Sequence, residues 1–112
     1  MKADQMNMAL QMEIIGYRET DNLTMDLKML LMELIWLEMA KDRYKFITDN
    51  IKILCEAEAY IECCKHCIHY NPEKSDNARA YVIQIIGCAF AKTIKTNAAE
   101  LGLKKTITKI KV

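Results

Sequence analysis

One short segment of the chain, residues 63–69, gathers residue types that often bind metal ions. It reads Cys-Cys-Lys-His-Cys-Ile-His, and Cys64 and Cys67 have the C-x2-C spacing of one half of a zinc site. A structural zinc ion needs a second ligand pair, for which only Cys88 follows. Because the segment continues a helical pattern, we expect its cysteines to pack as small apolar side chains, with a helical metal-binding module as the alternative.

No other group of residues has the spacing of a catalytic site. The sequence contains no nucleophile elbow, no glycine-rich phosphate loop and no histidine pair with zinc-protease spacing. Two histidines close together on one helix are weak evidence for catalysis. We therefore expect neither an enzyme nor a cofactor.

The elements that position these residues are predicted to be helices. The chain of 112 residues corresponds to one domain. It contains only 3 glycines and 1 proline, so few residues would interrupt a helix. Thr48 or Asp49 can cap a third helix, which Pro72 ends, and 75–77 can cap a fourth. We expect an all-α fold of three to four helices, at about residues 3–19, 23–43, 49–70 and 78–101. The domain then spans residues 1–102, and a basic tail spans residues 103–112.

Apolar residues recur at helical spacing within the first three predicted helices. Met6, Leu10, Ile14 and Tyr17 form one stripe of the first helix. The residues expected in the core from the second and third helices are Leu27, Leu30, Leu31, Leu34, Leu37, Ile51, Leu54, Cys55, Ile61 and Cys64. All 8 methionines lie within the first 39 residues, and we expect them in an adaptable core, with a binding surface as the alternative.

Charge is distributed unevenly along the chain. Residues 1–62 carry 7 Lys/Arg and 12 Asp/Glu, whereas residues 63–112 carry 9 and 3. The acidic half could meet a basic protein surface, and the basic half could contact phosphates. An odd number of cysteines, no apolar leader and no apolar run of membrane-spanning length predict a reducing cytosol and no membrane partner.

The fourth predicted helix combines aromatic, amide and basic side chains on one face. Tyr81, Gln84 and Cys88 are spaced three and four residues apart, and Lys92 and Lys95 continue the face. Such a face can contact phosphates and bases together. Solvated helices also carry this pattern, so it favours DNA binding only modestly.

The segment around this helix has more specific features. Residues 70–81 read Tyr-Asn-Pro-Glu-Lys-Ser-Asp-Asn-Ala-Arg-Ala-Tyr, followed by Ile83-Gln84 and by Ala-Phe-Ala-Lys-Thr-Ile-Lys at residues 89–95. This run resembles conserved region 2 of bacterial sigma factors, and in particular the late sigma factors of large tailed bacteriophages. The resemblance implies a sigma region 2-like helical bundle.

Two upstream segments extend the resemblance to about residues 10–95. Residues 10–19 are similar to the family's N-terminal helix, and residues 54–61 occupy the place of its D-L-I-Q-E-G helix. In sigma factors that helix binds the coiled-coil clamp helices of the polymerase β′ subunit. By position, the resemblance implies polymerase contacts by Leu54, Ala57, Glu58, Ile61 and Glu62. Leu54 replaces the usual leading acid and Ala57 the usual glutamine.

The next helix of sigma factors binds and opens an AT-rich promoter element. By position, the resemblance implies DNA contacts by Arg79, Tyr81, Gln84, Ile85, Cys88, Lys92 and Lys95. Gln84 and Ile85 replace the tryptophan pair of primary sigma factors, which phage late sigma factors also lack. The basic residues 103–112 differ from the hydrophobic and acidic tail with which those factors bind the sliding clamp, so clamp coupling is not expected.

The resemblance thus implies a late sigma factor acting in the cytoplasm of an infected bacterium. Such a protein binds the bacterial RNA polymerase core and directs it to AT-rich late promoters, with a phage late co-activator as a further candidate partner. A polymerase-binding regulator that does not recognise DNA is one alternative, and the metal-binding module is the other.

Overall fold

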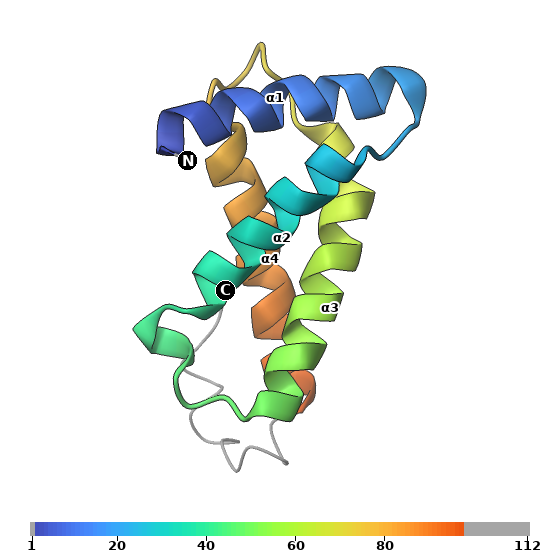
Figure 1. Ribbon diagram of the computed structural model, residues 1–112. Helices are drawn as coiled ribbons and strands as arrows, with labels where there is room; N and C mark the ends of the chain where they lie inside the picture. Colours follow the sequence, from blue (N-terminus) through green and yellow to red (C-terminus); the bar gives the residue numbers. More distant parts are fainter. Residues whose placement is uncertain (1, 98–112) are drawn as a thin grey trace.

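The computed structural model describes residues 2–97, which form four α-helices and two short 3-10 helices (Figure 1). The elements are α1 (Ala3–Thr20), α2 (Met25–Met39), η1 (Asp42–Tyr44), α3 (Asp49–His66), η2 (Cys67–His69) and α4 (Ala78–Thr96). In Figure 1, α1 lies across one end of the other three helices. No strand occurs within residues 2–97, and the predicted all-α class is confirmed.

Side-chain caps define where three of the helices begin. The hydroxyl of Thr48 accepts a hydrogen bond from the backbone N–H of Ile51, three residues later. The side-chain amide oxygen of Asn77 accepts one from the backbone N–H of Ala80 in the same way. Thr48 is one of the two caps predicted for α3, and Asn77 lies in the segment predicted to cap α4. The cap of α2 is Thr24, whose hydroxyl accepts a hydrogen bond from the backbone N–H of Leu27. Asp21 adopts a left-handed conformation (φ 55°) that ends α1.

Each helix contributes one apolar stripe to a single core. The buried side chains include Met6, Leu10, Ile14, Leu27, Leu30, Leu31, Leu34, Ile35, Ile51, Cys55, Ala59, Cys63, Val82, Ile86, Ala89, Phe90 and Ile94. The most extensive helix–helix packing is between α3 and α4. These two antiparallel neighbours therefore form the frame on which α1 and α2 pack.

Three leucine and isoleucine residues expected in the core are exposed instead: Leu37, Leu54 and Ile61. Each helix already fills the core with one stripe, and these residues lie on the side of their helix that faces away from it. Four methionines, Met8, Met12, Met25 and Met29, are also exposed, so the prediction of a methionine-rich core is wrong for them. Met6 and Met39 are buried as expected.

The second helix ends at Met39, four residues earlier than predicted. Glu38 is buried at 2% exposure, and its carboxylate receives Lys41 Nζ at 2.7 Å and the Arg43 guanidinium. On a continuing helix Lys41, three residues later, could still reach this carboxylate, but Arg43, five residues later, would lie on another side of the helix. The turn after Met39 lets both cations reach Glu38. The fourth helix, α4, ends at Thr96. The remainder of the predicted helix, the 1–102 boundary and the basic tail of residues 103–112 lie outside the described residues.

The Glu38 ion-pair cluster should contribute to stability. Burial on its own would raise the pKa of Glu38, but the hydrogen bonds from Lys41 and Arg43 outweigh it and lower the pKa below its ordinary value of 4.5. We predict that Glu38→Gln lowers the free energy of unfolding by about 1–3 kcal/mol at neutral pH. Urea unfolding followed by circular dichroism measures this.

The same experiment has a control and a pH dependence. Asp42→Asn removes an exposed carboxylate that pairs with Lys45 at 3.0 Å and should change stability little. Because ionised Glu38 is favoured in the folded state, its contribution is present above pH 4.5 and is lost as the pH falls below that value. A Glu38→Gln protein as stable as the wild type at neutral pH would contradict the account.

Candidate functional site

The side of α3 that faces away from the core presents apolar side chains next to a carboxylate. Leu54, Ala57 and Ile61 are exposed, with Leu54 at 47% and Ile61 at 46%, and Glu58 lies half-buried beside them. Their spacing of three and four residues places them on one helix face. We call these four residues the α3 outer face. It unites four of the five residues predicted to bind polymerase.

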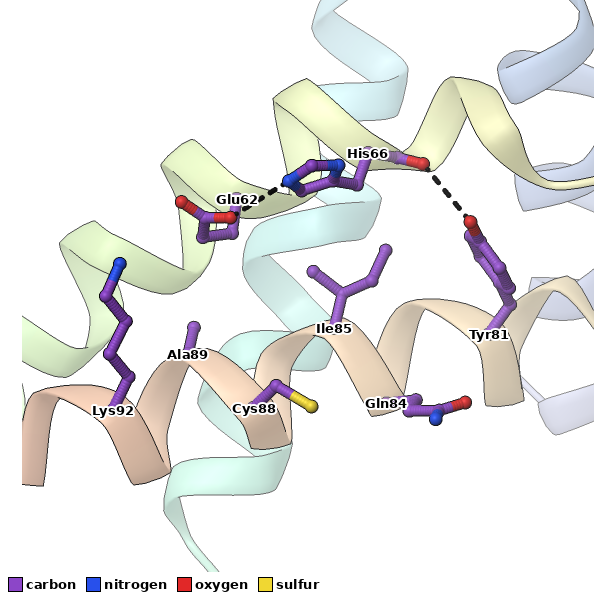
Figure 2. Close-up of a pocket in the computed structure, with 8 residues that line it drawn as sticks. All are labelled: Glu62, His66, Tyr81, Gln84, Ile85, Cys88, Ala89 and Lys92. Atoms are coloured by element: carbon purple, nitrogen blue, oxygen red, sulfur yellow. Dashed lines mark hydrogen bonds and ion pairs between the residues drawn. The ribbon is translucent and has the colours of Figure 1, made fainter. Parts of the chain in front are cut away.

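The fifth predicted residue, Glu62, lies on the edge of α3 that faces α4. There it helps to line a pocket of about 460 Å³ between the two helices (Figure 2). The residues that line this pocket are Glu62, His66, Tyr81, Gln84, Ile85, Cys88, Ala89 and Lys92. Five of the seven residues predicted to contact DNA are among them.

Polar groups from both helices surround the pocket. Glu62 Oε2 lies 3.1 Å from His66 Nε2, and the Tyr81 hydroxyl donates to the backbone oxygen of His66 over 3.4 Å. Lys92 Nζ lies 3.6 Å from Glu58 Oε1, so the lysine reaches from α4 to the α3 outer face. Figure 2 shows both the Glu62–His66 and the Tyr81–His66 interactions as dashed lines. The pocket is therefore bordered by a carboxylate and imidazole on α3 and by a cation on α4.

The pocket floor is apolar. Ile85 and the buried Ala89 point from α4 toward α3, and the exposed Gln84 and Cys88 follow the outer side of the helix (Figure 2). An apolar floor with an amide and an ammonium at its border can hold a planar ring and neutralise a nearby anion.

The remaining two predicted DNA contacts, Arg79 and Lys95, lie outside this pocket, near the two ends of α4. The backbone N–H of Arg79 donates to Asn7 Oδ1 at 3.0 Å, which ties the start of α4 to α1. Lys95 is exposed in the last turn. The structure thus spreads the predicted basic residues along α4 and gathers only Lys92 at the pocket.

Two residues of these surfaces were not among the predicted site residues. Ile53 is 65% exposed and lies next to the α3 outer face, and His66 lines the pocket. The four-residue spacing from Glu62 to His66 was a usable signal, because it places both side chains on one edge of a helix. No comparable signal distinguishes Ile53 from a core residue.

The cysteines of residues 63–69 pack as small apolar side chains, as predicted. Cys63 and Cys67 are fully buried, and Cys64 is half-buried. Burial raises the pKa of the Cys63 thiol to about 12 and that of Cys67 to about 11. Within residues 2–97, no group of three or more Cys, His, Asp and Glu residues is arranged to hold a metal ion.

Comparison of the chain with protein-family models, with curated proteins and with solved structures gives no match. Among residues 2–97, no helix has the length and apolar character needed to cross a membrane.

The burial of the cysteines predicts a sharp difference in thiol reactivity. Cys88, the exposed cysteine on the pocket, should react with a maleimide quickly near neutral pH. Cys63 and Cys67 should react only after unfolding, because their thiols are buried and almost entirely protonated. Mass spectrometry of the labelled peptides measures each site, and Cys88→Ser removes the fast-reacting group. Labelling of Cys63 at the rate of Cys88 would contradict the burial of Cys63 in the core.

Proposed function

We propose that this chain is a late sigma factor of the phage type. In this proposal the α3 outer face binds the β′ clamp helices of the bacterial RNA polymerase core, and α4 contacts AT-rich promoter DNA. The protein then acts in the cytoplasm of the infected host and needs no catalytic group of its own. The resemblance of residues 70–95 to sigma region 2 motivates the proposal.

The observation that carries the proposal is the α3 outer face. Leu54 and Ile61 are large apolar residues exposed on the helix that the resemblance assigns to polymerase binding. Exposed apolar side chains grouped on one helix face commonly mark a protein-binding surface. Glu58 beside them suits a basic partner.

The opposite net charges of α3 and α4 support a different binding partner for each helix. α3 carries four acidic residues and two lysines, a net charge of −2, whereas α4 carries Arg79, Lys92 and Lys95 and no acid, a net charge of +3. The cations of α4 can pair with phosphates, and Lys92 would then exchange its ion pair with Glu58 for one with DNA. The exposed Gln84 and the Tyr81 ring add groups that can hydrogen-bond and stack with bases.

Reconstituted transcription tests this function. The purified chain is mixed with bacterial core polymerase, and run-off transcripts are measured on templates with AT-rich late promoters. We expect a stable complex and transcripts that depend on the chain. A complex without transcripts would reject the sigma function, and the absence of any complex would reject polymerase binding altogether.

The second candidate is a polymerase-binding regulator that does not recognise DNA. The observation in its favour is the Glu58–Lys92 ion pair, because it partly neutralises the lysine nearest the pocket. Such a protein would form the polymerase complex and would inhibit or redirect transcription by another sigma factor. The run-off experiment separates the two candidates.

Substitutions on the α3 outer face should impair polymerase binding. We predict that Ile61→Ser and Glu58→Lys each weaken the complex with core polymerase about tenfold, through lost apolar burial and reversed charge. Met12→Ser is the matched control, since it truncates a similarly exposed apolar residue on α1. Fluorescence-anisotropy titration with labelled chain measures the affinity. An equal loss for Met12→Ser would show that the effect is not specific to α3.

Substitutions on α4 should impair promoter binding instead. We predict that Lys92→Ala and Lys95→Ala each weaken the polymerase–promoter complex severalfold at low salt and reduce the salt slope by about one. Neither substitution should lower the affinity for polymerase, and Lys92→Ala also releases Glu58 for a basic partner. Lys74→Ala, an exposed lysine in the loop before α4, is the control. Filter binding of promoter DNA across a salt series measures the effect. If polymerase affinity falls in parallel, this face of α4 contacts protein rather than DNA.

A further inference from the structure

α2 has a second apolar stripe on the side opposite the core. Met25, Met29 and Trp36 are exposed at 66%, 64% and 57%, and the half-buried Met32 lies between them along the helix. Among residues 2–97, the side chains of Met25, Met29 and Trp36 are mostly open to solvent, while Met32 also packs against the edge of the core. We call these four residues the α2 seam. A group of large apolar side chains on one solvent-facing helix marks an interaction surface.

The α2 seam has the spacing of a coiled-coil interface. Its residues are separated by four, three and four positions, which is the alternation of d and a positions in a heptad. In this register Lys28 occupies the g position and Glu33 the following e position. Neither residue has an ion-pair partner among the described residues.

We propose that the α2 seam is a self-association surface, on which α2 of a second copy packs in parallel. In a parallel pair, the g residue of one helix faces the e residue five positions later on its partner. Lys28 of each copy then faces Glu33 of the other. The two-fold symmetry forms this contact twice, so the surface is complementary to itself.

The charges select the parallel arrangement over the antiparallel one. Asp26 and Glu33 both lie on the e edge of the seam, and an antiparallel two-fold pair would bring these edges together. Four carboxylates would then meet, whereas the parallel pair joins a cation to an anion at each edge. This argument concerns α2 alone and is independent of the proposed function.

The short seam limits the strength of the dimer. It extends over 12 residues, or roughly 17 Å of helix, which is much less than a standard protein–protein interface offers. We therefore expect a dissociation constant on the order of 100 μM. The single tryptophan of the chain, Trp36, lies in the α2 seam, so its fluorescence reports directly whether the seam becomes buried.

The test is a concentration series of the full chain from about 1 μM to about 1 mM. Sedimentation equilibrium should show a monomer that becomes a dimer, and Trp36 emission should shift to shorter wavelength over the same range. Met29→Glu should keep the helical circular dichroism and remain monomeric throughout. Met12→Ser, which is outside the seam, should dimerise like the wild type. A wild-type chain that stays monomeric at every concentration would overturn the proposal.

A charge exchange tests the parallel pairing. Lys28→Glu and Glu33→Lys should each weaken dimerisation at least tenfold, because each places like charges at two contacts. The double variant Lys28→Glu/Glu33→Lys should return the dissociation constant to within about threefold of the wild type. Dimerisation that is insensitive to these exchanges, or a double variant as weak as the single ones, would refute the pairing of Lys28 with Glu33.

Discussion

The close packing of α4 against a row of small residues on α3 determines the positions of both candidate surfaces. Cys55, Ala59 and Cys63 of α3, followed by Cys67 of η2, recur every four residues and are fully buried. Small side chains at such a row let a neighbouring helix approach closely. Val82, Ile86, Ala89 and Phe90 of α4 belong to the same core and bring larger side chains to this junction.

This packing leaves each of the two helices with an outward side of different character. On α3 the outward side is apolar and acidic, and on α4 it is polar and basic. The distance between them is small enough for Lys92 to reach Glu58. In the proposed function, this closely packed helix pair would hold the polymerase-binding face and the DNA-binding face at a constant separation.

Much of the fold was predictable because the capping residues and the spacing of apolar residues in the sequence agree with the observed helix starts and buried side chains. Thr48 and Asn77 cap helices as expected, and Leu10, Ile14 and Leu27 are buried as their spacing indicates. The early end of α2 was not predictable, because it depends on Glu38 attracting two cations that follow it in the chain. Sequence periodicity alone treats such a carboxylate as a solvated residue.

The candidate site was harder to predict than the fold. Leu54 and Ile61 were assigned both to the core and, by resemblance, to polymerase binding, and these two assignments are physically incompatible. The structure exposes both residues, which excludes the core assignment. On α2 the spacing correctly predicted that Leu27, Leu30, Leu31 and Leu34 face the core. Because this helix has apolar residues on all sides, the spacing could not show that Met25 and Met29 stay exposed. Their exposure depends on how α1, α3 and α4 pack around α2.

The most direct test of the central claim uses photo-crosslinking in a single promoter complex. A benzophenone amino acid replaces Ile61 on the α3 outer face in one protein and Gln84 on α4 in another, and each is irradiated with core polymerase and an AT-rich promoter. The account predicts that position 61 crosslinks to the β′ subunit and position 84 to promoter DNA. Crosslinks from both positions to the same partner, or from position 61 to DNA, would contradict it.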